Sequence, residues 1–351
     1  MLEFLKKKWW KFLGGGLLLY VLVGGLLVPL GPGITVVQPS EMGANKSFQI
    51  QLTGFNTHFV SGGALQCFLK NGASYFLPNK LTAIDEEHLL LDVSFSAAQT
   101  KQFALHTLDV IVNTNRDGNV TLREAIAITD NASDTTAHPE MEAKVTNPEV
   151  EHNRYEGFAF PYREILYQSI RNTFYHVPMW FGMLFLIVLS VVYSVKYLNS
   201  QNLLYDTIAA ESVHVALLYG ILGLATGMMW ATYTWGEPWP NDPKLNGAAI
   251  GVLMYFAYVI LRGSLDHQVK RARISAVYNI FAAVFFIAFI FIIPRLTDSL
   301  HPGNGGNPAF SKYDLDSRLR LFFYPAVIGW ILLALWIASI RIRMKLLEEK
   351  A

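Results

Sequence analysis

The chain has 351 residues, of which 52% are hydrophobic and 16% charged, and its formal net charge is +1. Long uncharged apolar runs alternate with polar stretches, which predicts membrane spans and one soluble insert rather than a soluble globular protein. The near-zero net charge provides no basic surface, so we expect no nucleic-acid partner. With a single cysteine, Cys67, the chain cannot form an internal disulfide or a CxxC redox centre.

The amino-terminal segment is predicted to be the first span. Four lysines within the first eleven residues precede the apolar stretch 12–30, as in both signal peptides and uncleaved spans. No alanine occurs before Ala44, so an A-x-A cleavage site is missing. We therefore predict an uncleaved transmembrane helix in 1–32, with its basic end in the cytoplasm.

Residues 33–160 are predicted to form an inserted all-β domain. Hydrophobic residues recur at every second position in 48–52 and 89–95, the pattern of half-buried strands. Asn71-Gly72 lies between strand-like runs and is a hairpin turn signal. Short strands at this spacing favour an immunoglobulin-like (Ig-like) sandwich, and residues 34–59 resemble bacterial Ig-like (IPT/TIG) modules. We expect an accessory or docking domain without chemistry of its own.

One segment of the insert has the spacing of a calcium loop. In 113–124, NTNRDGNVTLRE, oxygen-bearing side chains occupy the first, third, fifth and ninth positions, glycine the sixth and glutamate the twelfth, as in an EF-hand. The candidate calcium ligands are Asn113, Asn115, Asp117 and Glu124. However, asparagine replaces the usual leading aspartate, and no second loop accompanies this one. The alternative is a solvated Asn/Asp/Gly turn without an ion.

From residue 161 onward the chain is predicted to return to the membrane, so that 161–351 forms five further spans. An interfacial helix leads to the first of them, and each apolar stretch is long enough to cross a bilayer. The stretches are 177–195, 212–233, 245–261, 274–293 and 321–340. Together with the first span they predict an all-α polytopic membrane protein with six transmembrane helices.

The distribution of basic residues predicts the orientation. The links 196–211 and 262–273 and the basic tail all fall on the side of the amino end, which matches the positive-inside rule for a bacterial inner membrane. Both chain ends are then cytoplasmic, and the β insert is periplasmic. The loop 294–320 and the loop between the third and fourth spans share that outer face.

The tryptophan loop, residues 227–245, connects the third and fourth spans. It contains Trp230, Tyr233, Trp235 and Trp239 beside turn-forming glycine and prolines. Large aromatic faces on a backbone that cannot continue as helix predict a flat apolar platform at the membrane surface. The alternative is an ordinary interfacial aromatic belt, because Trp and Tyr concentrate at headgroup depth in membrane proteins.

Two histidines accompany this loop on the outer face. His176 (YHVP) precedes the second span, and His301 (LHPG) follows the fifth. Neutral imidazole nitrogens are suitable axial ligands for haem iron, and aromatic side chains stack on a planar apolar macrocycle. We therefore predict a haem held edge-on between the two imidazoles, against the tryptophans. Each histidine taken alone could instead be an interfacial hydrogen-bonding residue.

His214 and Asp242 each have two interpretations. An ionisable group such as His214, near the cytoplasmic end of the third span, indicates function by default, but hydrogen bonding to Glu211 or to a backbone carbonyl explains it as well. Asp242 either pairs with a cation such as Lys244 or caps the start of the fourth span, where the helix dipole favours an acid.

Three motifs, in this order, resemble the cytochrome c maturation protein C (CcmC) family of haem-handling membrane proteins, which have a tryptophan-rich "WWD" loop. They are TFYHVPMW (173–180), GMMWATYTWGEPWPNDPKLN (227–246) and DSLHPG (298–303), and the resemblance covers 1–30 and about 162–351. It implies that His176 and His301 are the axial ligands of a haem b. It also implies that Trp230, Trp235, Trp239 and Asp242 belong to the haem platform.

The resemblance further implies a haem-binding subunit of cytochrome c biogenesis that makes no covalent bond itself. Such a subunit holds haem at the periplasmic face and delivers it to a haem chaperone (CcmE). ABC transporter subunits (CcmA and CcmB) drive release, and a small CcmD subunit is a common companion. Membrane lipids surround the spans.

The sequence departs from the family pattern in two respects. Pro238 and Asn241 stand where the family usually has further tryptophans, and the insert 33–160 is not part of the compact family pattern. From its position, we expect the insert to contact the chaperone or another outer-face partner.

Two other functions remain open. A CcsA-type cytochrome c synthase attaches haem directly to apocytochrome c, but such proteins generally have additional spans and paired histidines within the membrane, where only His214 is available here. A structural receptor would have an aromatic belt without haem, and its β domain would carry the function.

Overall fold

The computed structural model describes residues 8–43, 46–129, 143–146, 155, 157–301 and 315–349. The chain divides into two compact units, a helical unit of Met1–Leu27 with Gln168–Ala351 and a β unit of Val28–Tyr167. Within these described residues, the helical unit contains six helices that are long and apolar enough to cross a membrane, so the chain is a multi-pass membrane protein.

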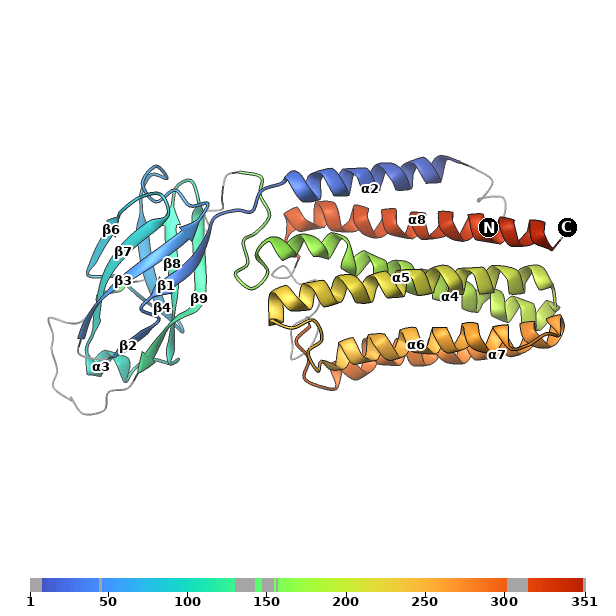
Figure 1. The fold of residues 1–351 in the computed structure, drawn as a ribbon. Coiled ribbons are helices and arrows are strands. Elements are labelled where there is room, and N and C mark those ends of the chain that lie inside the picture. Colours follow the sequence, from blue (N-terminus) through green and yellow to red (C-terminus); the bar gives the residue numbers. More distant parts are fainter. Residues whose placement is uncertain are drawn as a thin grey trace. The chain divides into compact units, whose positions relative to one another are not determined.

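The six long helices correspond to the six predicted spans, and each is several residues longer than its apolar stretch or shifted relative to it (Figure 1). They are α2 (Trp9–Leu27), α4 (His176–Ser200), α5 (Leu203–Trp235), α6 (Pro243–Gly263), α7 (Gln268–Ile287) and α8 (Ser317–Glu348). At its carboxyl end α7 continues as a π-helical turn, η3 (Ala288–Ile292), and a 3₁₀ turn, η4 (Ile293–Arg295).

The segment before α4 is helical, as the sequence predicts. Tyr167–Phe174 forms a 3₁₀ helix, η2, rather than an α-helix, and it leads into α4. Its side chains bind neighbouring helices, since Arg171 donates to the Gly25 carbonyl of α2 and Asn172 to the Thr226 carbonyl of α5. These interhelical hydrogen bonds fix the segment against the bundle.

Capping residues determine where the helices begin and end near the tryptophan loop. Gly236 takes a left-handed conformation (φ 83°), and its N–H donates to the Thr232 carbonyl, which ends α5. Asp242 caps α6, with Pro243 at its first position. The loop between α5 and α6 is therefore short, and it joins the carboxyl end of α5 to the amino end of α6.

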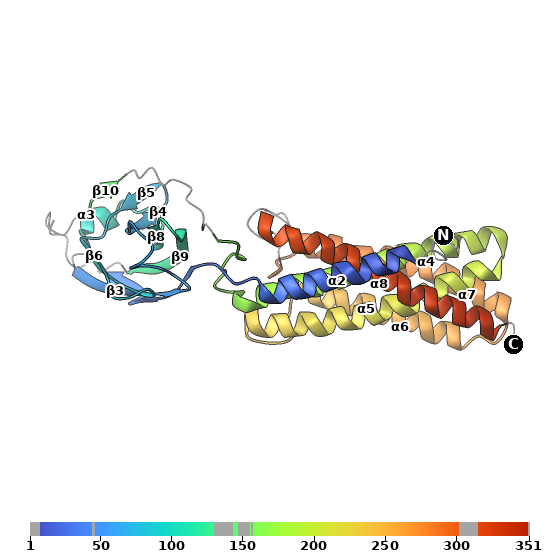
Figure 2. The same ribbon diagram turned by 90° about the horizontal axis from the view of Figure 1, so that it is seen from above.

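The helices pack around a common interior. α2 lies along α8 in both views (Figures 1 and 2), and Tyr20 of α2 stacks on Phe322 of α8 with ring centroids 5.0 Å apart. A buried core joins α4 to α8 with side chains from each helix. Its members include Met183, Leu186, Tyr219, Tyr255, Phe286 and Ala334.

Polar pairs connect the helices near the start of α5. Arg262 of α6 donates to both carboxylate oxygens of Asp206, at 2.8 and 2.6 Å. Arg341 of α8 donates to Glu211 at 2.7 Å. A carboxylate taken out of water needs a close, hydrogen-bonded cation. Arg262 supplies it for Asp206, and Arg341 supplies it for Glu211.

His214 lies beside these pairs. Its Nδ1 is 2.9 Å from the Ala210 carbonyl oxygen and 3.7 Å from the Glu211 carboxylate. Both partners that would explain this histidine structurally are therefore present, at the end of α5 opposite the tryptophan loop.

The β unit is built of two sheets around one apolar core. Four strands form one sheet in the order β1-β3-β7-β6, and six form the other in the order β10-β5-β4-β8-β9-β2. The strands are β1 (Gly33–Gln38), β2 (Glu41–Gly43), β3 (Lys46–Phe55), β4 (Gln66–Asn71), β5 (Ser74–Phe76), β6 (Lys80–Ala83), β7 (His88–Phe95), β8 (Thr107–Thr114), β9 (Gly118–Thr129) and β10 (Val145–Thr146), with a short helix α3 (Ala97–Thr100).

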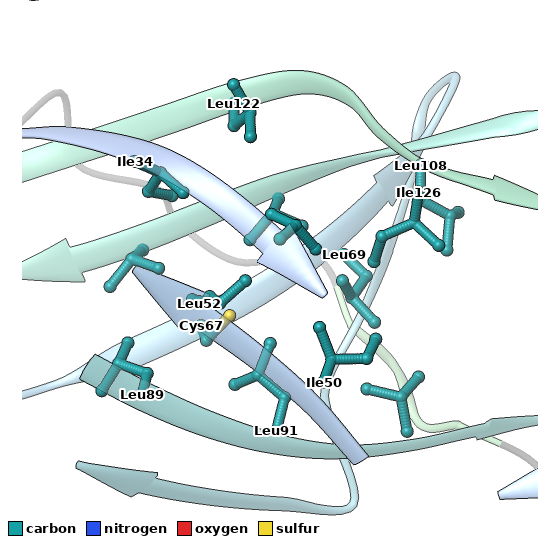
Figure 3. Packing of buried hydrophobic residues seen from close by; sticks show 14 of the residues in the cluster. Ile34, Ile50, Leu52, Cys67, Leu69, Leu89, Leu91, Leu108, Leu122 and Ile126 are labelled. Carbon is teal, nitrogen blue, oxygen red and sulfur yellow. The ribbon is translucent and has the colours of Figure 1, made fainter. Parts of the chain in front are cut away.

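The strand predictions are confirmed. The alternating residues of β3 and β7 are fully buried at Ile50, Leu52, Leu89 and Leu91, and they face the core in Figure 3. Asn71 pairs with Ser74 across the β4–β5 turn, where Gly72 has φ 56°, as the hairpin signal predicts. The all-β character holds, and the Ig-like topology stays a prediction.

The structure does not form an EF-hand loop at 113–124. This segment is the β8–β9 hairpin, in which Asn113 pairs with Asn119 and donates to its side chain at 2.5 Å. The Asp117 carboxylate accepts from the backbone and the ring of His58, and Glu124 lies farther along β9, where its N–H donates to Asp109. Because an extended strand separates Glu124 from Asn113, the side chains do not surround one point. Calcium binding therefore lacks the loop geometry that the spacing predicts.

Cys67 lies in the core of the β unit, 1% exposed, and burial raises the pKa of its thiol to about 12. We expect a maleimide reagent at pH 7 to leave the native protein unmodified and to label Cys67 completely in denaturant. Mass spectrometry of the two samples measures this. Rapid labelling of the native protein would show that the sandwich core opens readily.

Candidate functional site

His176 is the first residue of α4, and its ring contacts α5. Nδ1 lies 3.0 Å from the Gly223 carbonyl oxygen and 3.1 Å from the Thr226 hydroxyl, which itself donates to the Leu222 carbonyl. A carbonyl oxygen can only accept, so Nδ1 carries the hydrogen in the neutral ring. The lone pair is then on Nε2, the nitrogen that remains for a metal ligand.

His301 is held in the same way by Asp242. Its Nδ1 lies 3.1 Å from Asp242 Oδ1, and the N–H of Leu300 donates to Oδ2 at 2.7 Å. Burial alone would raise the pKa of the Asp242 carboxyl, but the hydrogen bonds from His301 and Leu300 hold it well below its usual range. The carboxylate is thus ionised and accepts, which again leaves Nε2 of the histidine with its lone pair.

Asp242 also caps α6. Oδ1 accepts from the N–H groups of Lys244 and Leu245, at 2.9 and 3.2 Å. Of the two interpretations offered by the sequence, the helix cap is the one that the structure forms. The bond to His301 was not predicted, because Asp242 and His301 are separated by two helices in the sequence.

The structure brings both histidines to one end of the helical unit. His176 lies against residues in the last turns of α5, and His301 lies against Trp235, the last residue of α5, and Asp242, the cap of α6. The two imidazoles therefore lie at the same end of α5 as the tryptophan loop. A ligand that reached both Nε2 atoms would lie beside the tryptophan loop.

The aromatic side chains divide between the two histidines. Trp230 contacts the His176 ring edge to face, with centroids 5.7 Å apart, and Trp235 contacts His301 at 4.9 Å. Trp239 is 36% exposed and donates from Nε1 to Asn246. Tyr233 is 75% exposed and makes no ring contact with either histidine in the described structure.

Asn241 and Pro238 are the two loop positions that depart from the family pattern, and the structure explains the first of them. Asn241 accepts from the Asn246 amide at 2.9 Å, so Asn246 connects Asn241 and Trp239 to the first turns of α6. These bonds hold the loop where the family usually has more aromatic surface. No described contact explains Pro238.

Two further residues lie next to the candidate site, and the sequence analysis did not assign them to haem binding. Trp180 lies one helical turn after His176, with ring centroids 6.3 Å apart, and the i, i+4 spacing could have indicated it. Lys244 is half-buried in the first turn of α6, and its backbone N–H donates to Asp242 Oδ1 at 2.9 Å. Its position two residues after the Asp242 cap was the available signal.

Comparison with known families shows which family the chain matches. Residues 155–351, more than half of the chain, match the CcmC family, described as "Heme exporter protein C". The chain belongs to the CcmC family. The matched region contains both histidines, the tryptophan loop and five of the six spans, whereas the β unit lies almost entirely outside it.

Individual relatives are named for cytochrome c biogenesis. The cytochrome c biogenesis protein CcsA of Prochlorococcus marinus subsp. pastoris is 34% identical over 95 residues, which cover 27% of this chain and 30% of that protein. CcsA of Prochlorococcus marinus strain MIT 9515 is 37% identical over 90 residues, or 26% of this chain and 28% of that protein. The match thus spans less than a third of these relatives. Family membership supports a role in haem handling for cytochrome c biogenesis.

Proposed function

We propose that the protein binds haem b between His176 and His301 and presents it for cytochrome c assembly. One observation supports this most strongly. Each imidazole has Nδ1 bound to a fixed acceptor, Gly223 or Asp242, so that two Nε2 lone pairs are available at one end of the bundle. Outer hydrogen bonds of this kind orient histidine ligands and raise their basicity toward iron.

The surroundings suit a porphyrin. Trp230 and Trp235 supply apolar faces next to the two ligands, and a macrocycle buried against them loses contact with water. Haem also has two carboxylates, which need cations when they leave bulk water. Lys244, half-buried in the first turn of α6 after the Asp242 cap, is the residue that we assign to this charge.

The site faces outward in the orientation that the basic residues favour. Arg262, Arg271, Arg273 and Arg341 belong to the opposite end of the helices, and the positive-inside rule assigns that end to the cytoplasm. We therefore propose a bacterial inner-membrane protein with both ends cytoplasmic and with the haem site and β unit periplasmic. Protease protection in spheroplasts, read with tags on the β unit and on the carboxyl end, tests this orientation.

We propose that the bound haem is then delivered to a chaperone. A haem held by two imidazoles and no covalent bond can be passed on, and the CcmC family name describes export. The proposed partners are a CcmE-like chaperone, CcmA- and CcmB-like transporter subunits and a CcmD-like small subunit. We propose no bond-making role for the chain itself.

Direct attachment is the second candidate, because the two Prochlorococcus relatives are CcsA proteins. Between their ends, the described spans contain one histidine, His214, and its ring is hydrogen-bonded at the far end of α5. Co-expression with an apocytochrome c, once without any other maturation protein and once with a CcmE-like chaperone, separates the two. Covalent haem on the cytochrome would support a synthase, and haem on a co-expressed chaperone alone would support delivery.

Replacing Trp239 by alanine should weaken haem binding by about 1 kcal/mol, or roughly fivefold, through lost aromatic contact. Titration of the purified variant with haem measures it. Trp9, 56% exposed at the start of α2, is the control, and Trp9→Ala should leave the affinity unchanged. Equal affinities for Trp239→Ala and the wild type would remove Trp239 from the platform.

A further inference from the structure

A row of three glycines on α5, Gly220, Gly223 and Gly227, faces α4. A Cβ added at each would meet a different α4 side chain at less than van der Waals distance: Met183 Sδ at 2.9 Å, Trp180 Cε2 at 2.9 Å and His176 Cε1 at 2.8 Å, respectively. The partners ascend α4 as the glycines descend α5, as antiparallel packing requires. Small residues at such an interface allow two helices to approach closely.

The last glycine of this row differs from the others in what it touches. Gly227 lies under the His176 ring, and a Cβ there would also lie 3.4 Å from Nδ1 and 3.7 Å from Nε2. The ring is at the same time bound at Nδ1 by the Gly223 carbonyl, 3.0 Å away. One helical turn of α5 thus positions the imidazole in two ways. The Gly223 carbonyl binds Nδ1, and the absence of a side chain at Gly227 leaves room for the ring.

The direction of the displacement is determined by these contacts. A methyl group at Gly227 would push the edge of the ring that bears Cε1, the atom between the two nitrogens. The ring could then turn about its Nδ1 bond to the Gly223 carbonyl, or it could give up that bond and move away from the new methyl group as a whole. Either movement changes the direction of the Nε2 lone pair.

We propose that Gly227 is a positioning residue for haem ligation, which sets the direction of His176 Nε2 without touching haem. This inference rests on the proposed function, because it assumes that His176 binds the iron. It assigns a second role to a glycine that also belongs to the row along which α5 packs against α4. Gly220 performs that packing two helical turns away.

The test compares Gly227→Ala with two matched variants in the full-length protein, purified in detergent and supplied with haem. Gly220→Ala introduces an equally close contact, with Met183, away from the ligand. Gly263→Ala adds a methyl group where nothing lies within 4 Å. Absorption spectra, haem titration and melting temperature without haem are recorded for each.

We expect Gly227→Ala to bind haem about tenfold more weakly or worse, in the range seen when a ligand's outer support is removed. Its spectrum should change from six-coordinate toward five-coordinate, and added imidazole should restore the six-coordinate form. Gly220→Ala should lower the melting temperature while keeping the wild-type spectrum, and Gly263→Ala should change neither.

A double-mutant cycle keeps the test decisive if Gly227→Ala folds poorly. In a His176→Ala background the ring that the methyl group would displace is gone, so adding Gly227→Ala should change melting temperature and haem affinity little. Full additivity in this cycle would overturn the proposal, as would a wild-type spectrum and affinity in Gly227→Ala. Equal loss of ligation in Gly220→Ala would assign the effect to helix packing instead. A wild-type protein without a Soret band would overturn the proposed function itself.

Discussion

Replacing both His176 and His301 by alanine should remove the Soret band from the purified, haem-supplied protein. Each ring is fixed through its Nδ1, so each single replacement should leave one axial position open and convert the spectrum to five-coordinate. Since loss of an outer-shell partner alone costs about 10–100-fold in metal affinity, loss of a ligand should cost at least about 100-fold.

The controls for this experiment are histidines with other partners. His214 is bonded to the Ala210 carbonyl, and His58 is bonded to Asp117 in the β unit. Alanine at either position should leave the spectrum unchanged. If the His176/His301 double variant retained the wild-type spectrum, the ligand assignment would be wrong. A change on replacing His214 would instead support a synthase-like path through the membrane.

Changing Asp242 should have the second largest effect, because one carboxylate serves both a helix and a ligand. Asp242→Ala removes the cap of α6, worth about 1 kcal/mol, and buried hydrogen bonds to a charged group, worth about 1.5–3 kcal/mol each. It also frees the His301 ring, which should lower haem affinity about 10–100-fold. Thermal unfolding and haem titration measure the two losses.

Two further variants separate these roles. Asparagine is as good a helix cap as aspartate, so Asp242→Asn should keep most of the stability while weakening the charge-assisted bond to His301 and hence haem binding. Asp316 caps α8 by accepting from Leu319 at 2.8 Å, and Asp316→Ala should cost about 1 kcal/mol of stability with haem binding intact. If Asp242→Asn bound haem like the wild type, Asp242 would be only a cap.

The sequence was sufficient for the elements whose signals are local. Apolar runs of about 20 residues identify the spans, and every-second-residue alternation identifies β3 and β7, because both patterns arise from the repeat of a single element. It was insufficient for the segment 113–124, where oxygen-bearing residues at calcium-loop spacing lie on a β-hairpin. Strand pairing placed Glu124 far from Asn113, and no local spacing rule includes that pairing.

At the site, the sequence by itself determined which residue types are available and on which loops: two histidines, a tryptophan loop and an acid before α6. Only the tertiary structure decided their partners. It paired Asp242 with His301 across two helices, set His176 against the Gly223 carbonyl and placed Gly227 beneath its ring. The physical reason is that helix patterns specify which face is buried, whereas the direction of an imidazole lone pair depends on acceptors and empty space supplied by another helix.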